Sequence, residues 1–503
     1  MKIINLYQEK VNKNLFNGAI TSIFLQVLTV LSQLILTPLI ILNTNLELLG
    51  AYAFLMQLIA LLIILDFGVS ASITRYLSRN WRNDNKQFYS YFALSKKLLS
   101  IIGVLCSITL LIINSTGVLN HALTDAQMIN DLTVSLYMFS VWLVIKGYLN
   151  SYSTAINAMQ EYATYNWSAI VELLVKIILS AYFIKNGYGL LGLVIAHIFG
   201  EVVSYSIRYY KFIELTKGLS NDYKKNKKDN KQKLKKIFNF AKKYWVTMLG
   251  TMLIYNTDQI VISQLFGAEE SAKLYIVKTF VLFLIQIFVQ LSDLLIPWLN
   301  QKNKHEANKK SNYYHNLSLA VTLLITVFLS LILFKYLELS LLFWVGQQDV
   351  SIYLMLLMMV MLSSQTIAKS NEVFILVTNE YGRTPLYTIL LGIITIISAL
   401  SLGPSLEVYQ VFTFYAGAMF LKMTIVLSKS IGHHQLKCLN LLNMFILCVT
   451  LVSIFSIFPY LLTINSIGTL VFDAIVFTLC YAAITWVLLF PLNFISRSCN
   501  NET

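Results

Sequence analysis

Long apolar runs recur along this sequence and decide what it can fold into. About twenty consecutive apolar residues form a helix that crosses the hydrocarbon core of a bilayer. Runs of that kind lie at about 17–42, 48–78, 90–113, 132–158, 163–184, 188–212, 238–264, 271–297, 315–336, 349–376, 385–402, 406–428, 440–462 and 467–492. The chain is 57% hydrophobic and only 12% charged, which is too apolar for a water-soluble domain. The sequence therefore predicts an all-α polytopic membrane protein with about 14 transmembrane helices.

The positive charges predict how these helices are oriented. If the N-terminus is cytoplasmic, the loops expected inside carry nearly all of the loop lysines and arginines. The segments expected outside, 114–131, 264–270 and 402–407, carry none. Because Lys and Arg are enriched in cytoplasmic loops, we expect a multi-pass protein with both termini cytoplasmic.

A basic segment at 213–237 predicts the division of the chain into two halves. It separates six expected helices in 17–212 from six in 238–428, and two more helices follow in 429–492. Residues 1–16 are expected to form a cytoplasmic amphipathic N-terminus, and 493–503 a cytoplasmic tail. With an even number of helices, the halves would be parallel repeats, as in many transporters. We therefore expect two six-helix lobes around a central cavity. The basic linker is either a topology signal or a site for anionic lipid.

No resident cofactor or metal is expected. The five cysteines are scattered and lack C-x-x-C spacing, so they indicate neither a disulfide framework nor a metal site. No G-x-x-x-x-G-K-[ST] phosphate loop occurs, so we do not expect the chain itself to hydrolyse ATP.

Polar residues inside the apolar runs follow the helical period. A charge at the bilayer centre costs about 2.5–3.5 kcal/mol, so such residues should face protein or water. In 132–158 the polar positions Lys146, Asn150, Ser153 and Asn157 form one stripe. In 17–42 a similar stripe contains Ser22, Gln26, Thr29, Gln33 and Thr37. It ends at Pro38, which should kink that helix and act as a hinge. Both stripes predict the wall of a cavity.

Further polar positions leave two interpretations open. One stripe, in 48–78, contains Asp66, Ser70, Thr74 and Ser78, and Arg75 lies off it. The other groups each lie within one expected span: Glu172 and Lys176; His197 and Glu201; Thr247, Thr251 and Asp258; and Gln365, Lys369 and Glu372. Glu172–Lys176 and Lys369–Glu372 are spaced either as neutralising pairs or as substrate contacts. His197–Glu201 is either an interhelical hydrogen-bond site or a proton-coupling site, and Arg75 is either a snorkelling anchor or a cavity cation.

Two stretches carry a family resemblance. They are "LGAYAFLMQLIALLIILDFGVSASITRYLS" and "YNTDQIVISQLFGAEESAKLYIVKTF". They resemble the signature segments of bacterial oligosaccharide flippases of the O-antigen (Wzx) type, which are polysaccharide biosynthesis transporters of the multidrug/oligosaccharidyl-lipid/polysaccharide exporter superfamily. The matching positions are Gly50, Tyr52, Asp66 to Gly68, Thr74, Arg75, Asp258, Gly267 and Tyr275.

The resemblance implies a function and roles for the polar residues. Such a protein alternates between inward-open and outward-open states, and flips an undecaprenyl-pyrophosphate-linked oligosaccharide to the outer leaflet of the bacterial inner membrane for O-antigen or other surface polysaccharide synthesis. It is a transporter and not an enzyme. Its partners would be membrane lipids and the polymerase and chain-length proteins of the pathway, and not nucleic acid. The roles expected here are pyrophosphate binding for Arg75, Lys146, Lys176 and Lys369; a polar lining for Gln26, Gln33, Asn150, Asn157, Thr247 and Thr251; and ion coupling for Asp66, Glu172, His197, Glu201 and Asp258.

Three alternatives remain open at the level of sequence. A multidrug or cation antiporter of the same fold would bind cationic molecules on carboxylates. The charges within the expected spans are evenly balanced and do not reject it. A lipid II flippase shares the expected helix count. A membrane-embedded polysaccharide polymerase is less favoured, because the longest loop expected outside, 114–131, has no Lys or Arg.

Overall fold

The computed structural model describes residues 2–434, except for 82, 118–122, 124, 218–226, 302–306, 347–350 and 379–381. These residues form thirteen α-helices and two short 3-10 helices, and no strand occurs among them. Ten helices are long and apolar enough to cross a membrane. The structure therefore confirms the prediction of an all-helical, multi-pass membrane protein. The spans expected at 440–462 and 467–492, and the tail at 493–503, lie outside the described residues.

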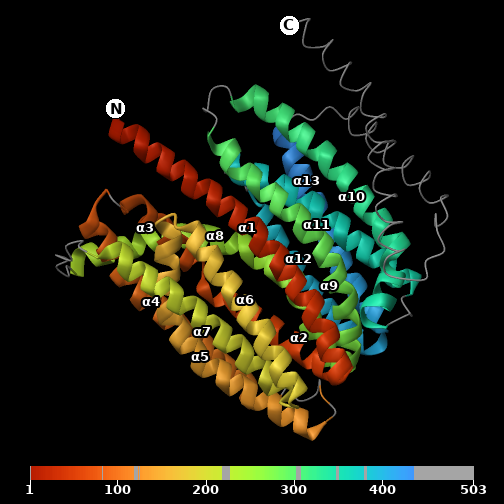
Figure 1. Cartoon of the computed structure of the whole chain (residues 1–503). Helices are drawn as coiled ribbons and strands as arrows, with labels where there is room; N and C mark the ends of the chain where they lie inside the picture. Colours follow the sequence, from red (N-terminus) through yellow and green to blue (C-terminus); the bar gives the residue numbers. More distant parts are fainter. Residues whose placement is uncertain are drawn as a thin grey trace, which may run out of the picture.

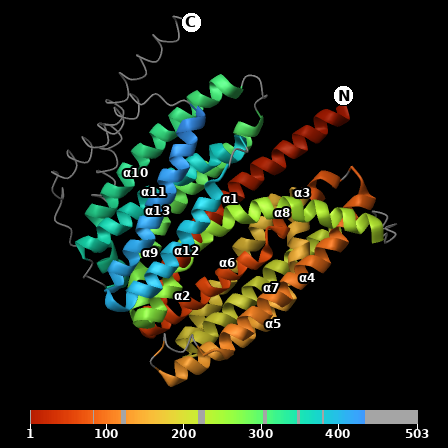
Figure 2. The same ribbon diagram turned by 180° about the vertical axis from the view of Figure 1, so that it is seen from behind.

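The helices group into two halves, which Figures 1 and 2 show from opposite sides. The first half contains α1 (Lys2–Asn43), α2 (Leu46–Leu61), η1 (Leu62–Asp66), α3 (Val69–Asn80), α4 (Asn85–Ser115), α5 (Ala126–Ala158), α6 (Tyr162–Lys185) and α7 (Gly189–Thr216). The second contains α8 (Lys227–Tyr255), α9 (Asp258–Gln301), α10 (Ala307–Val345), α11 (Ile352–Thr378), α12 (Thr384–Leu402), η3 (Gly403–Ser405) and α13 (Val408–His434). Helix α1 runs between them (Figure 1), packs on α6 and also contacts α9.

Short polar caps begin several of these helices. Asn45 Oδ1 accepts a hydrogen bond from Leu48 N at 2.9 Å, and Asp84 Oδ1 accepts one from Gln87 N at 3.0 Å. Each cap satisfies a backbone donor that has no partner within the helix. Because lipid offers no such partner, polar caps fix where a span can begin.

The expected continuous span at 48–78 is broken, and that prediction was wrong. Helix α2 tightens into η1, and Phe67 and Gly68 then adopt left-handed backbone conformations with φ of 50° and 73°. Glycine tolerates this conformation at little cost. Helix α3 starts afresh beyond the break, and Asp66 accepts hydrogen bonds from Ser70 N and Ser70 Oγ. One role of Asp66 is therefore to cap α3.

Helix α9 folds back on itself at Gly267, whose φ of 87° and ψ of 170° are non-helical. Asp258 Oδ2 lies 2.5 Å from Lys278 Nζ. In a straight helix, residues twenty positions apart would be separated by about 30 Å. The span expected at 238–264 is thus α8 followed by the short segment 258–266, and the turn expected within 264–270 lies at Gly267.

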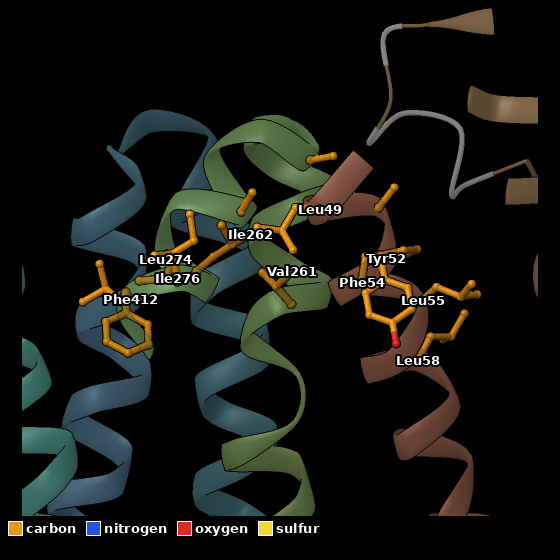
Figure 3. Close-up of a cluster of buried hydrophobic side chains, with 14 of the residues drawn as sticks. Leu49, Tyr52, Phe54, Leu55, Leu58, Val261, Ile262, Leu274, Ile276 and Phe412 are labelled. Atoms are coloured by element: carbon orange, nitrogen blue, oxygen red, sulfur yellow. The ribbon is translucent and has the colours of Figure 1, made fainter. Parts of the chain in front are cut away.

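The two halves meet at both ends of the molecule. At one end, which the charge distribution predicts to be the outer one, α2 packs against α9. Figure 3 shows buried side chains of α2, α9 and α13 at this end, among them Leu49, Phe54, Ile262 and Phe412. At the other end α3 packs against α8. There Ser72 Oγ donates a hydrogen bond to Ile237 O at 2.9 Å.

Candidate functional site

A cavity of about 620 Å³ lies within the first half of the molecule. Helices α1, α2, α4 and α5 supply most of its wall, and α6, α7 and α9 supply single or paired residues. Its volume lies within the range of about 300–1,000 Å³ that is typical of small-molecule sites. The wall is mainly apolar, with a limited number of polar groups directed into it.

Two of the predicted stripes supply these polar groups. Thr29, Gln33 and Thr37 come from α1, and Lys146 and Asn150 come from α5. Because residues four apart lie on one face of a helix, each stripe presents several polar side chains to the same space. Three more predicted residues line the cavity: Asp66, Lys176 and His197.

Lys146 forms an ion pair with Glu201 across α5 and α7. Its Nζ lies 2.6 Å from Glu201 Oε1, and the two side chains are 28% and 10% exposed. Glu201 also accepts a hydrogen bond from Trp142 Nε1, and His197 Nε2 lies 3.8 Å from its Oε1. The positive charge of Lys146 is therefore already compensated by the protein.

A double-mutant cycle tests this pairing. Lys146→Gln and Glu201→Gln each remove one partner, so we expect the double variant to lose less stability than the sum of the single variants. The expected coupling in the free energy of unfolding is about 1–3 kcal/mol. The same cycle for Lys146→Gln with Asp66→Asn should give less than about 0.5 kcal/mol. Equal couplings in the two cycles would show that Glu201 is not the partner.

Lys176 has a different environment from Lys146. Among the residues that the structure describes, no carboxylate lies within ion-pair distance of its Nζ, although Glu172 is one helical turn away. Its nearest ring is that of Tyr52, with the centroid 5.8 Å from Nζ. The spacing that suggested a Glu172–Lys176 ion pair thus does not produce one. Lys176 is a cation that lines the cavity and has no carboxylate partner among the described residues.

Several predicted site residues do not line this cavity. Arg75 is exposed and stacks over the Phe240 ring at 4.5 Å, in the contact between α3 and α8. Gln26 donates a hydrogen bond to Gln286 at 3.0 Å. The other predicted site residues that do not line the cavity are Asn157, Glu172, Glu201, Thr251, Asp258 and Lys369. Thr247 lies on α8, and its side chain is outside the described part. Pro38 lies within the single helix α1.

In the described part of the second half, two ion pairs connect separate segments. Asp258 pairs with Lys278 in a buried pair, and Glu372 of α11 pairs with Lys422 of α13 at 2.8 Å. Glu372 therefore has its partner on a neighbouring helix, whereas its spacing from Lys369 left a pair within α11 open as one interpretation. No group of three or more His, Cys, Asp or Glu side chains that could hold a metal ion occurs in the described part of the chain.

Sequence reasoning missed two aromatic contributions to the site. Trp142 holds Glu201, and Tyr275 of α9 lines the cavity opposite the first half of the molecule. Trp142 lies four residues before Lys146 and therefore on the same helical face. Tyr275 is one of the positions that match the family, but the resemblance gave it no role in the site.

Comparison with known proteins places the chain in a family. The family model described as "Polysaccharide biosynthesis protein" matches residues 15–302, which is more than half of the chain. The chain belongs to this family. No curated protein matches the chain significantly.

Solved structures of members of one superfamily share the fold of this polysaccharide biosynthesis protein. The lipid II flippase MurJ in its inward closed conformation is 15% identical, with a TM-score of 0.61 over 94% of this chain and 99% of that chain. A MATE protein in the bent conformation is 11% identical, with a TM-score of 0.57 over 87% and 97%. An outward-facing multidrug resistance MATE family transporter of the MOP superfamily is 13% identical, with a TM-score of 0.57 over 89% and 97%. At these identities the similarity shows the fold alone.

Proposed function

We propose that the protein is a flippase for a lipid-linked oligosaccharide. Its cargo would be an undecaprenyl-pyrophosphate-linked repeat unit, moved from the inner to the outer leaflet of the bacterial cytoplasmic membrane for O-antigen or other surface polysaccharide synthesis. The observation that carries the proposal is Lys176, a cation without a carboxylate partner among the described residues, which lines a mainly apolar cavity that also contains several polar side chains. Membership in the polysaccharide biosynthesis family supports it.

The chemistry of the cavity suits an anion with a sugar attached. Lys146 is neutralised by Glu201, and the Asp66 carboxylate is held at the start of α3 by Ser70, so Lys176 is a cavity cation that has no carboxylate partner among the described residues. Lysine is a compact point charge that binds phosphate. Gln33, Asn150 and the threonines of α1 supply donors and acceptors for hydroxyl groups.

The membrane potential would favour this direction of transport. With the cell interior negative, each negative charge that moves outward gains about 2.3 kcal/mol per 100 mV. A doubly charged pyrophosphate could thus be exported without ATP. Asp66, Glu172, His197, Glu201 and Asp258 remain our candidates for additional ion coupling. Arg75 and Lys369 remain candidates for a cargo contact in another state, and Pro38 for the bend of α1.

Lys176→Gln tests the proposal in a strain that lacks its own copy of the gene. Loss of a charged hydrogen bond in a protein costs about 1.5–3 kcal/mol, so we expect export to fall by about tenfold or more. Lys176→Arg should retain part of the activity, because the charge remains while its geometry changes. Export is measured as the fraction of lipid-linked glycan that a membrane-impermeant lectin reaches on spheroplasts. Protein level in the membrane is measured beside it.

Lys211→Gln is the matched control, because Lys211 is a half-buried lysine that pairs with the exposed Glu214 at the end of α7. It should export normally. Full export by well-expressed Lys176→Gln would contradict the anion site. Efflux of cationic dyes that is unaffected by Lys176→Gln would instead favour an antiporter, and rescue of cells depleted of lipid II flippase would favour lipid II as cargo.

A further inference from the structure

One residue of the cavity wall comes from the second half of the molecule. All of the other described lining residues belong to α1–α7 or η1, whereas Tyr275 belongs to α9. A ligand held in this cavity would therefore touch the first half through many side chains. It would touch the second half through Tyr275.

Tyr275 and Lys176 line the same cavity. Tyr52, which also lines the cavity, has its ring centroid 5.8 Å from Lys176 Nζ. Tyr52 belongs to α2, which packs directly on α9, the helix of Tyr275. Lys176, which has no carboxylate partner among the described residues, thus shares the cavity wall with one phenol from each half.

Tyr275 is also firmly connected to the rest of its half. Lys278 lies three residues further along the same helix, and its Nζ pairs with Asp258 at 2.5 Å. The same ammonium group donates a hydrogen bond to Tyr255 O, at the end of α8, at 3.4 Å. Because a buried ion pair is costly to separate, a displacement of Tyr275 should move α8 and both segments of α9 together.

We propose that Tyr275 is the residue through which bound cargo contacts the second half of the molecule. Its hydroxyl donates a hydrogen bond to a phosphate oxygen of the anion that Lys176 holds, so that the diphosphate group bridges the two halves. This inference rests on the proposed function, since it requires an anion at Lys176. Through this contact, binding of the anion would be coupled to a movement of one half relative to the other.

The test measures the relative movement of the halves directly. Ser72 Oγ of α3 lies 2.9 Å from Ile237 O of α8, at the end opposite to Tyr275. Cysteines placed at positions 72 and 237 of an otherwise cysteine-free full-length protein should form a disulfide, because both Cβ atoms belong to this close contact, and the rate of its formation reports the contact. The probe is inorganic pyrophosphate at saturating concentration, with binding measured separately by calorimetry. A second arm uses undecaprenyl pyrophosphate in nanodiscs, which separates a lipid-linked ligand from a free one.

We expect pyrophosphate to change the rate of disulfide formation in the parent protein severalfold. In Tyr275→Phe, binding should persist with about 10- to 100-fold lower affinity, as for loss of one hydrogen bond to a charged group, and saturation should still be reached at a higher concentration. The change in disulfide rate should then be lost at saturation. Tyr353→Phe is the control, because Tyr353 bonds Thr413 on the exposed side of α11 and α13 and should respond as the parent does.

The outcomes separate the two proposals. If Tyr275→Phe binds pyrophosphate and still shows the full change in rate, Tyr275 is not the connecting residue, and the anion site at Lys176 stands. If the parent binds neither pyrophosphate nor undecaprenyl pyrophosphate, the anion site itself is wrong and both proposals fall. If only undecaprenyl pyrophosphate produces the change and Tyr275→Phe abolishes it, the proposal holds for the lipid-linked form of the ligand.

Discussion

Gly50→Ala is expected to hold the outer end of the molecule open. A Cβ atom at Gly50 would lie 1.8 Å from the carbonyl oxygen of Ala268, and its neighbours there are backbone atoms that cannot rotate away. Helices α2 and α9 must therefore separate. A tenfold shift between two states needs only about 1.4 kcal/mol, which an overlap of this size exceeds. We expect a cysteine at Met56, which lines the cavity, to react more than about tenfold faster with a bulky maleimide.

Gly417→Ala is the matched control for this effect. Gly417 lies within α13, and a Cβ atom there would meet nothing within 4 Å. Its maleimide rate should equal that of the parent, and its melting temperature should not fall, because Ala is the better helix former. Gly68→Ala should loosen the opposite end, because the new Cβ would lie 2.5 Å from Ala241 O. If Gly50→Ala and Gly417→Ala behave alike, the close contact between α2 and α9 does not hold the outer end closed.

Asp258→Ala is expected to destabilise the second half by about 3–5 kcal/mol, because it leaves the ammonium group of Lys278 buried without its carboxylate. The Asp258 side chain is 0% exposed and that of Lys278 is 7% exposed. The free energy of unfolding is measured by denaturation of the purified protein in mixed micelles. The double variant Asp258→Leu/Lys278→Met should recover most of the loss, since it removes both charges.

Glu270→Ala provides the comparison on the same helix. Glu270 pairs with Lys273 at 2.6 Å, but the two side chains are 37% and 32% exposed. Ion pairs of this kind contribute only about 0–1 kcal/mol. A loss for Asp258→Ala that is no larger than the loss for Glu270→Ala would mean that the buried pair does not connect the two segments of α9.

The sequence could predict which side chains share a helical face, because the helical period is a local property. This is why Thr29, Gln33 and Thr37 lie together on the cavity wall, as do Lys146 and Asn150. The stripes also contained residues that fall outside the cavity, such as Gln26 in the middle of α1 and Asn157 near the end of α5. Period alone does not say how far along a helix a cavity extends.

Ion-pair partners could not be predicted in the same way. Lys146 and Lys176 are both mid-span lysines, yet Lys146 is neutralised by Glu201 and Lys176 has no such partner among the described residues. Partners on other helices depend on how those helices pack, and spacing within one helix does not contain that information.

The break at Phe67 and Gly68 was missed although a local signal was present. Asp66 followed by Ser70 has the pattern of a side chain that caps a new helix, and Gly68 permits a positive φ. The strong hydropathy of 48–78 outweighed this signal. An aspartate before a glycine within an apolar run is better interpreted as a helix start than as a buried charge.

The break in the expected second span uncouples the two contacts that this span makes with the second half of the molecule. Because no continuous helical hydrogen-bond ladder runs through Phe67 and Gly68, α2 and α3 are two separate short helices. Helix α2 packs against α9, and α3 packs against α8. Separation of α2 from α9 therefore moves α3 little, so this span does not force one end to close when the other end opens. In the proposed flippase, the coupling between the two ends would then come from bound cargo that contacts both halves at once.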